Sequence, residues 1–76
     1  MDKKLRDEWE QLCYEHNSAR DTYHRAFSTV YTAFRSLYEN KTSKGPSRSD
    51  INKMEAAWDS WQAIQRKMRE FCKKYA

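Results

Sequence analysis

The 76-residue sequence has little glycine, proline or cysteine, and each shortage narrows the folds it can adopt. The one glycine and the one proline are adjacent, at Gly45 and Pro46, so every other position can lie inside a helix. The two cysteines are too few for a disulfide framework. No apolar run approaches the roughly 20 residues that span a bilayer, and no apolar signal region follows the first residues. We therefore expect a helical, cytoplasmic protein with reduced thiols and no membrane partner.

A chain of this length forms one domain at most, which we expect to cover residues 1–76. So short a chain struggles to bury enough apolar surface to offset the entropy lost on folding. Without a disulfide framework, the remaining routes to stability are close helix packing and self-association, with a bound metal as an outside alternative. Aromatic residues make up 14% of the chain, which argues against disorder despite 34% charged residues.

Apolar residues in the first half of the chain recur at steps of three and four, which is the period of an amphipathic helix. The pattern lasts for about five heptads and predicts a helix over about 2–39. Ser18 and Asp21 resemble a capping box, so a break near Asn17-Ser18 and a three-helix bundle are the alternative. The apolar pattern continues in phase through this point, which favours one continuous helix.

A polar segment over about 40–47 is the clear loop of the sequence. Ser47 and Asp50 then form a capping box at the start of a second apolar pattern, which predicts a helix over about 48–75. A short loop makes consecutive helices antiparallel neighbours. The predicted fold is therefore an all-α, long antiparallel helical hairpin.

Each apolar stripe covers an arc about 160° wide, which is more than one neighbouring helix can bury. We expect two copies to pair and complete a four-helix bundle, with a different protein on the same surface as the main alternative. In the register that we predict, Cys72 lies beside His16, Gln65 faces Tyr23, and the first helix projects past the end of the second. The residues expected at the dimer or partner interface are Leu5, Trp9, Leu12, Tyr23, Phe27, Trp58 and Trp61.

Cys13, His16 and Cys72 are the residue types that bind zinc, and the first two lie one helical turn apart. No fourth ligand is evident, so we interpret the cysteines as small core residues and His16 as a polar position that fixes register. We expect no metal and no cofactor.

Two groups of basic residues could contact phosphates, one around the loop and one near the end of the chain. They are Lys41, Lys44 and Arg48, and Arg66, Lys67, Arg69, Lys73 and Lys74. No helix-turn-helix, zinc-finger or RNA-binding pattern accompanies them. A solvated face that complements the helix dipole is the simpler interpretation.

The sequence has no glycine-rich phosphate loop and no nucleophile elbow, and its carboxylates are spread over solvent-facing positions. We therefore expect a small non-enzymatic interaction protein, an adaptor, inhibitor or regulator of a protein partner, acting as a homodimer. The alternative is a small basic nucleic-acid-binding protein. The size and helical simplicity also suit accessory proteins of phages, plasmids or operons.

Overall fold

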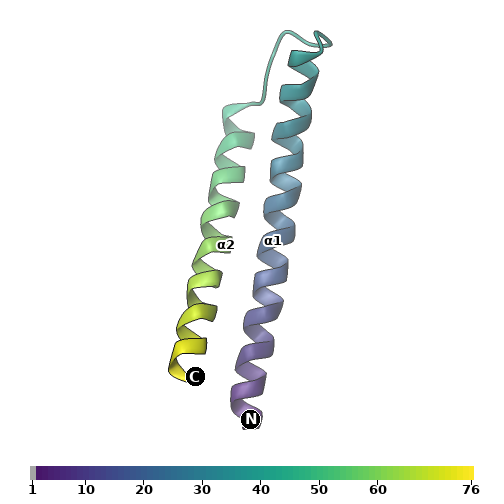
Figure 1. Cartoon of the computed structure of the whole chain (residues 1–76). Coiled ribbons are helices and arrows are strands. Elements are labelled where there is room, and N and C mark those ends of the chain that lie inside the picture. The colour runs from purple at the N-terminus through teal and green to yellow at the C-terminus, as the bar shows by residue number, and fades with distance from the viewer. Residues whose placement is uncertain (1) are drawn as a thin grey trace.

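The computed structural model describes residues 2–76 and consists of two long helices joined by a loop (Figure 1). Helix α1 spans Lys3–Tyr38 and helix α2 spans Arg48–Lys74. The two helices pack antiparallel, and residues 2–76 contain no strand. The all-helical hairpin predicted from the sequence is confirmed, with helix boundaries within one residue of those expected.

Helix α1 runs through Asn17 and Ser18 without a break. The Ser18 carbonyl accepts a 3.0 Å hydrogen bond from the Thr22 hydroxyl, as happens inside a helix. The three-helix alternative is therefore wrong. The apolar pattern that stays in phase across this segment outweighs the local capping signal.

Both helices begin at a side chain that caps a free backbone N–H group. The Asp2 carboxylate accepts a 3.0 Å hydrogen bond from the Lys4 backbone N–H. The Ser47 hydroxyl accepts one of the same length from the Asp50 backbone N–H, as the sequence predicts. These local bonds explain why the helix starts were predictable.

Helix α1 ends in a Schellman motif, with asparagine in the position that glycine usually takes. Asn40 has a left-handed φ of 62°, the Lys41 N–H donates to the Ser36 carbonyl at 2.9 Å, and the Asn40 N–H donates to the Leu37 carbonyl at 3.1 Å. The loop then runs back along the end of α1, where a Cβ placed on Gly45 would lie 3.3 Å from Leu37 Cδ2. Part of the loop is therefore used alongside α1 before α2 begins.

The register between the helices differs from the predicted one. Trp61, and not Cys72, lies beside His16, with their rings 5.9 Å apart. Trp58, and not Gln65, packs on Tyr23 at 5.2 Å. Helix α2 is thus displaced by roughly two to three turns toward the start of α1. The loop's return path along α1 and the fit of the tryptophans against Tyr23 account for this displacement.

The displacement moves the overhang of α1 to the other end of the hairpin. The Trp9 ring contacts the Phe71 ring at 5.5 Å, so the end of α2 covers the segment that we expected to project. Figure 1 shows the last turns of α1 extending beyond the start of α2. Tyr31, Phe34 and Tyr38 lie within the last eight residues of α1, and all three are exposed.

The hairpin has almost no interior. Of residues 2–76, Ala57 is the only buried one. The radius of gyration is 17.3 Å, against about 11 Å for a compact chain of this length. The accessible surface is 6107 Å², about 1,200 Å² more than expected for a compact 9.2 kDa protein. A single hairpin therefore leaves exposed an area of the size that a stable interface covers.

Candidate interaction surface

A continuous series of aromatic contacts leads from between the helices to the outside of the molecule. The Trp61 and Trp58 rings lie 5.6 Å apart, and Trp58 packs on Tyr23 at 5.2 Å. Tyr23 contacts Phe27 at 6.0 Å, and Phe27 stacks on Tyr31 at 6.1 Å. These centroid distances are typical of favourable aromatic pairs. The series begins at the half-buried Trp61 and ends on exposed side chains.

Four aromatic residues of α1 lie on one face of the helix, because they are spaced by four, three and four positions. We call these four and Trp58 of α2 the aromatic surface. Its members and their exposed fractions are Phe27 44%, Tyr31 55%, Phe34 59%, Tyr38 82% and Trp58 44%. Tyr31, Phe34 and Tyr38 also line one shallow hollow of about 170 Å³, so this end of the aromatic surface is contiguous.

The aromatic surface is large for a free-standing protein. Five aromatic side chains exposed to this degree present on the order of 600 Å². Contiguous apolar patches on monomers rarely exceed a few hundred Å², and larger ones mark interaction sites. The aromatic surface is therefore our candidate functional site.

Basic residues outnumber acidic ones in the half of the hairpin that carries the aromatic surface. We call residues 22–58 the loop half; it contains six Lys or Arg and three Asp or Glu, for a net charge of +3 out of the chain's +4. Its basic residues are Arg25, Arg35, Lys41, Lys44, Arg48 and Lys53. The Glu39 carboxylate already pairs with Arg35 at 2.8 Å and with Lys41 at 3.6 Å. The aromatic surface thus lies in a cationic neighbourhood.

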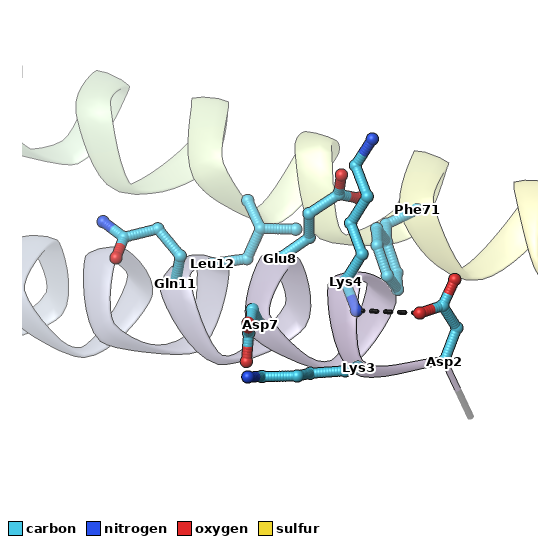
Figure 2. Close-up of a pocket in the computed structure, with 8 residues that line it drawn as sticks. All are labelled: Asp2, Lys3, Lys4, Asp7, Glu8, Gln11, Leu12 and Phe71. Atoms are coloured by element: carbon cyan, nitrogen blue, oxygen red, sulfur yellow. Dashed lines mark hydrogen bonds between the residues drawn. The ribbon is translucent and has the colours of Figure 1, made fainter.

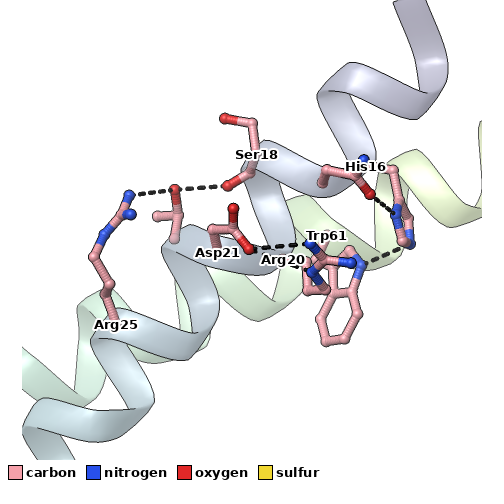
Figure 3. Close-up of polar contacts among 8 residues, drawn as sticks. His16, Ser18, Arg20, Asp21, Arg25 and Trp61 are labelled. Atoms are coloured by element: carbon pink, nitrogen blue, oxygen red, sulfur yellow. Dashed lines mark hydrogen bonds and ion pairs between the residues drawn. The ribbon is translucent and has the colours of Figure 1, made fainter. Parts of the chain in front are cut away.

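His16 and Trp61 connect the two helices near their middle (Figure 3). The indole Nε1–H of Trp61 donates to His16 Nε2 at 3.0 Å, and His16 Nδ1 lies 3.3 Å from Asn17 Oδ1. Because an indole N–H can only donate, Nε2 accepts, and the proton of the neutral imidazole is on Nδ1, from where it donates to Asn17. This part-buried hydrogen bond favours one register over its neighbours.

The three residues considered as metal ligands are not arranged as a metal site. No three His, Cys, Asp or Glu residues within the described part of the chain are placed to hold a metal ion. His16 is bonded to Trp61, and Cys72 lies with aromatic side chains in a hollow of about 240 Å³. Cys13 is half-buried and Cys72 is exposed. The predicted proximity of His16 and Cys72 was wrong because the register was wrong.

A shallow hollow of about 850 Å³ lies at the end of the hairpin opposite the loop. Figure 2 shows acidic and basic side chains from the first turns of α1 around it, with Leu12 and Phe71 as its apolar part. Asp2 is engaged there by the Lys4 backbone N–H. The mixed charges and open shape do not form an acid–base pair across a cleft, so we assign no chemistry to this hollow.

The predicted interface residues fall into two groups in the structure. Phe27 and Trp58 belong to the aromatic surface. The other five, all half-buried within the hairpin, are Leu5, Trp9, Leu12, Tyr23 and Trp61. Tyr31, Phe34 and Tyr38 were not among the interface residues predicted from the sequence. They lie on the predicted apolar arc, but the assumed register placed the overhang at the other end.

The two predicted groups of basic residues lie at opposite ends of a hairpin that is 57 Å long. Lys41 and Lys44 line a hollow of about 530 Å³ beside the loop. At the other end, Lys73 pairs with Glu70 at 3.8 Å, and the Lys74 ammonium lies 5.3 Å from the centre of the Tyr75 ring. The structure therefore does not join the two groups into one basic surface.

Comparisons with protein-family models, curated proteins and solved structures found no match to this chain. Within residues 2–76, neither helix has an apolar stretch long enough to cross a membrane.

Proposed function

We propose that this protein is a non-enzymatic interaction protein, an adaptor, inhibitor or regulator of a protein partner, that acts as a homodimer. Two hairpins would pack into a four-helix bundle. The observation that carries the proposal is the missing interior: Ala57 alone is buried among residues 2–76, and the surface exceeds that of a compact chain by about 1,200 Å².

The free energy gained by covering apolar surface favours dimerisation over its entropic and electrostatic costs. If half of the excess surface is apolar, covering it gives on the order of 15 kcal/mol for each chain. The loss of translational and rotational freedom costs about 4–15 kcal/mol for the complex. Repulsion between exposed like charges contributes about 1 kcal/mol or less for each pair. Apolar burial is therefore the dominant effect.

A second copy is a better candidate for this role than an occasional partner. A hairpin with so small an interior needs cover whenever it is folded. A second copy is present wherever the chain is made, and mass action then links folding to dimerisation. The further protein partner would bind the completed dimer.

The proposal assigns no catalytic group to this protein. No polar or charged side chain among residues 2–76 is buried. Catalytic acids and bases usually lie in clefts where burial and charged neighbours alter their protonation.

Light scattering coupled to size-exclusion chromatography tests the homodimer. We expect a molar mass of twice 9.2 kDa at tens of micromolar protein. Elution volume alone is insufficient, because a hairpin 57 Å long elutes earlier than a compact monomer. A mass of 9.2 kDa at every concentration would remove the homodimer.

Nucleic-acid binding is the second candidate function, favoured by the aromatic side chains beside the cations of the loop half. Single-stranded nucleic acids bind proteins through such combinations of stacking and phosphate contacts. Electrophoretic shifts of a labelled oligonucleotide over a salt series test it. Phosphate contacts are strongest at low salt, so absence of a shift there would exclude this function.

A further inference from the structure

On the face of α1 that carries the aromatic surface, the aromatic residues are confined to the loop half. Stepping back along α1 by sevens keeps to one side of the helix. From Phe34 and Phe27 the next positions are Arg20, Cys13 and Arg6. From Tyr38 and Tyr31 they are His24, Asn17 and Glu10. The same face thus changes from aromatic to mainly polar near the middle of the hairpin.

We propose that the second copy docks on the aromatic surface with loop half against loop half, so that its binding strengthens as salt screens the charges gathered there. This inference rests on the proposed homodimer and adds where the copies meet and how their assembly is regulated. Phe27, Tyr31, Phe34 and Trp58 from each copy form the apolar centre of the interface.

Symmetry supports this arrangement. In a two-fold dimer the same patch is used on both copies, so the patch must be complementary to itself. Aromatic rings packed on aromatic rings satisfy this condition. Placing the loop half of one copy on the other end of its partner would set Tyr31 and Phe34 against positions such as Arg20, Asn17 and Glu10. Polar groups covered in that way lose water without gaining partners.

The size of the aromatic surface also fits a second copy of the chain. The five side chains of the aromatic surface present on the order of 600 Å². A standard interface buries about 800 Å² on each partner. The aromatic surface alone thus provides most of one side of a stable dimer, and the flanking stems of nearby side chains provide the remainder.

The charge of the loop half gives this dimer a characteristic salt dependence. Each copy brings a net charge of +3 to the interface region. Salt screens like charges at its rim, over about 10 Å at 0.1 M ionic strength. The dimer therefore tightens with added salt. Binding of a nucleic acid or an acidic protein to the same cations has the opposite dependence.

Sedimentation equilibrium of the full chain at NaCl concentrations from about 0.02 to 0.5 M tests the proposal. We expect the dimer dissociation constant to fall several-fold as salt rises. The double variant Arg25→Gln, Lys44→Gln removes charge outside the apolar centre, and we expect it to dimerise more tightly at low salt and to respond less to salt.

A surface variant tests the location. Phe34→Ser changes a side chain that is 59% exposed in the hairpin, and we expect it to weaken dimerisation at least tenfold with unchanged helical circular dichroism. Tyr14→Ser is the matched control, because Tyr14 is also an exposed aromatic of α1, 70% exposed and outside the aromatic surface. We expect this control to dimerise as the unchanged protein does.

The outcomes separate the two proposals. A dimer that Phe34→Ser leaves intact, or one that weakens with added salt, overturns the loop-half arrangement and leaves the homodimer standing. A monomer at every salt concentration overturns both. If that monomer binds a dT oligonucleotide at low salt, and Phe34→Ser abolishes this binding, the aromatic surface is a nucleic-acid site instead.

Discussion

Trp61 of α2 donates a 3.0 Å hydrogen bond to His16 of α1, and their rings lie 5.9 Å apart. This part-buried hydrogen bond joins two residues that are 45 positions apart in the sequence. In any other register the indole N–H of Trp61 would lose this acceptor. The bond therefore favours one alignment of the helices.

Trp61→Phe keeps the ring packing and removes the donor. We expect it to lower the free energy of unfolding by about 1 kcal/mol, because His16 loses its partner in a part-buried position. Thermal unfolding followed by circular dichroism measures this. His16→Leu and the double variant complete a mutant cycle, and a coupling energy near zero would mean that the bond does not contribute to stability.

Ser47→Ala removes the N-cap of α2. We expect a loss of about 1 kcal/mol, since the Asp50 N–H then lacks its 3.0 Å acceptor. Ser49→Ala is the control, because residue 49 lies inside the first turn, where alanine is the better helix former. Urea unfolding measures both. Equal effects of the two changes would show that Ser47 does not cap the helix in solution.

Asn40 has a φ of 62° at the end of α1, a conformation that costs a residue with a Cβ more than glycine. We therefore expect Asn40→Ala to destabilise the hairpin by about 1 kcal/mol and Asn40→Gly to be neutral or stabilising. The midpoint of thermal unfolding checks the order of the three proteins. If the alanine variant were as stable as the glycine variant, the left-handed turn would be absent in solution.

We expect Trp9→Ala to reduce the stability of each hairpin and Phe34→Ala to reduce self-association. Trp9 packs on Phe71 within one hairpin, so its loss lowers the free energy of unfolding by about 2 kcal/mol or more. Phe34 is 59% exposed, so its loss acts mainly on self-association. Unfolding curves over a range of protein concentrations separate the two effects, because only coupled dimerisation makes the midpoint depend on concentration. We expect this dependence to persist in Trp9→Ala and to shrink in Phe34→Ala; the reverse result would place the interface at the start of α1.

The residues of the candidate site were only partly predictable. Phe27 and Trp58 followed from the apolar stripes, and both lie on the aromatic surface. Tyr31 and Tyr38 lie on the same arc, but whether an arc position faces α2 or solvent depends on where α2 begins alongside α1. The starting point of α2 depends on the path of the loop past Leu37, and the spacing of apolar residues does not predict that path.

The sequence by itself determined the two helices, their ends and their antiparallel order. These features depend on interactions within a few residues: the three-and-four spacing, the Ser47 cap and the Gly45-Pro46 loop. Only the tertiary structure decided the register. Stripes about 160° wide permit several alignments one turn apart, and the choice among them depends on how Trp58 and Trp61 fit Tyr23 and His16 across the helices. That fit exposes the end of α1 and covers its start, which is why the candidate interaction surface lies beside the loop.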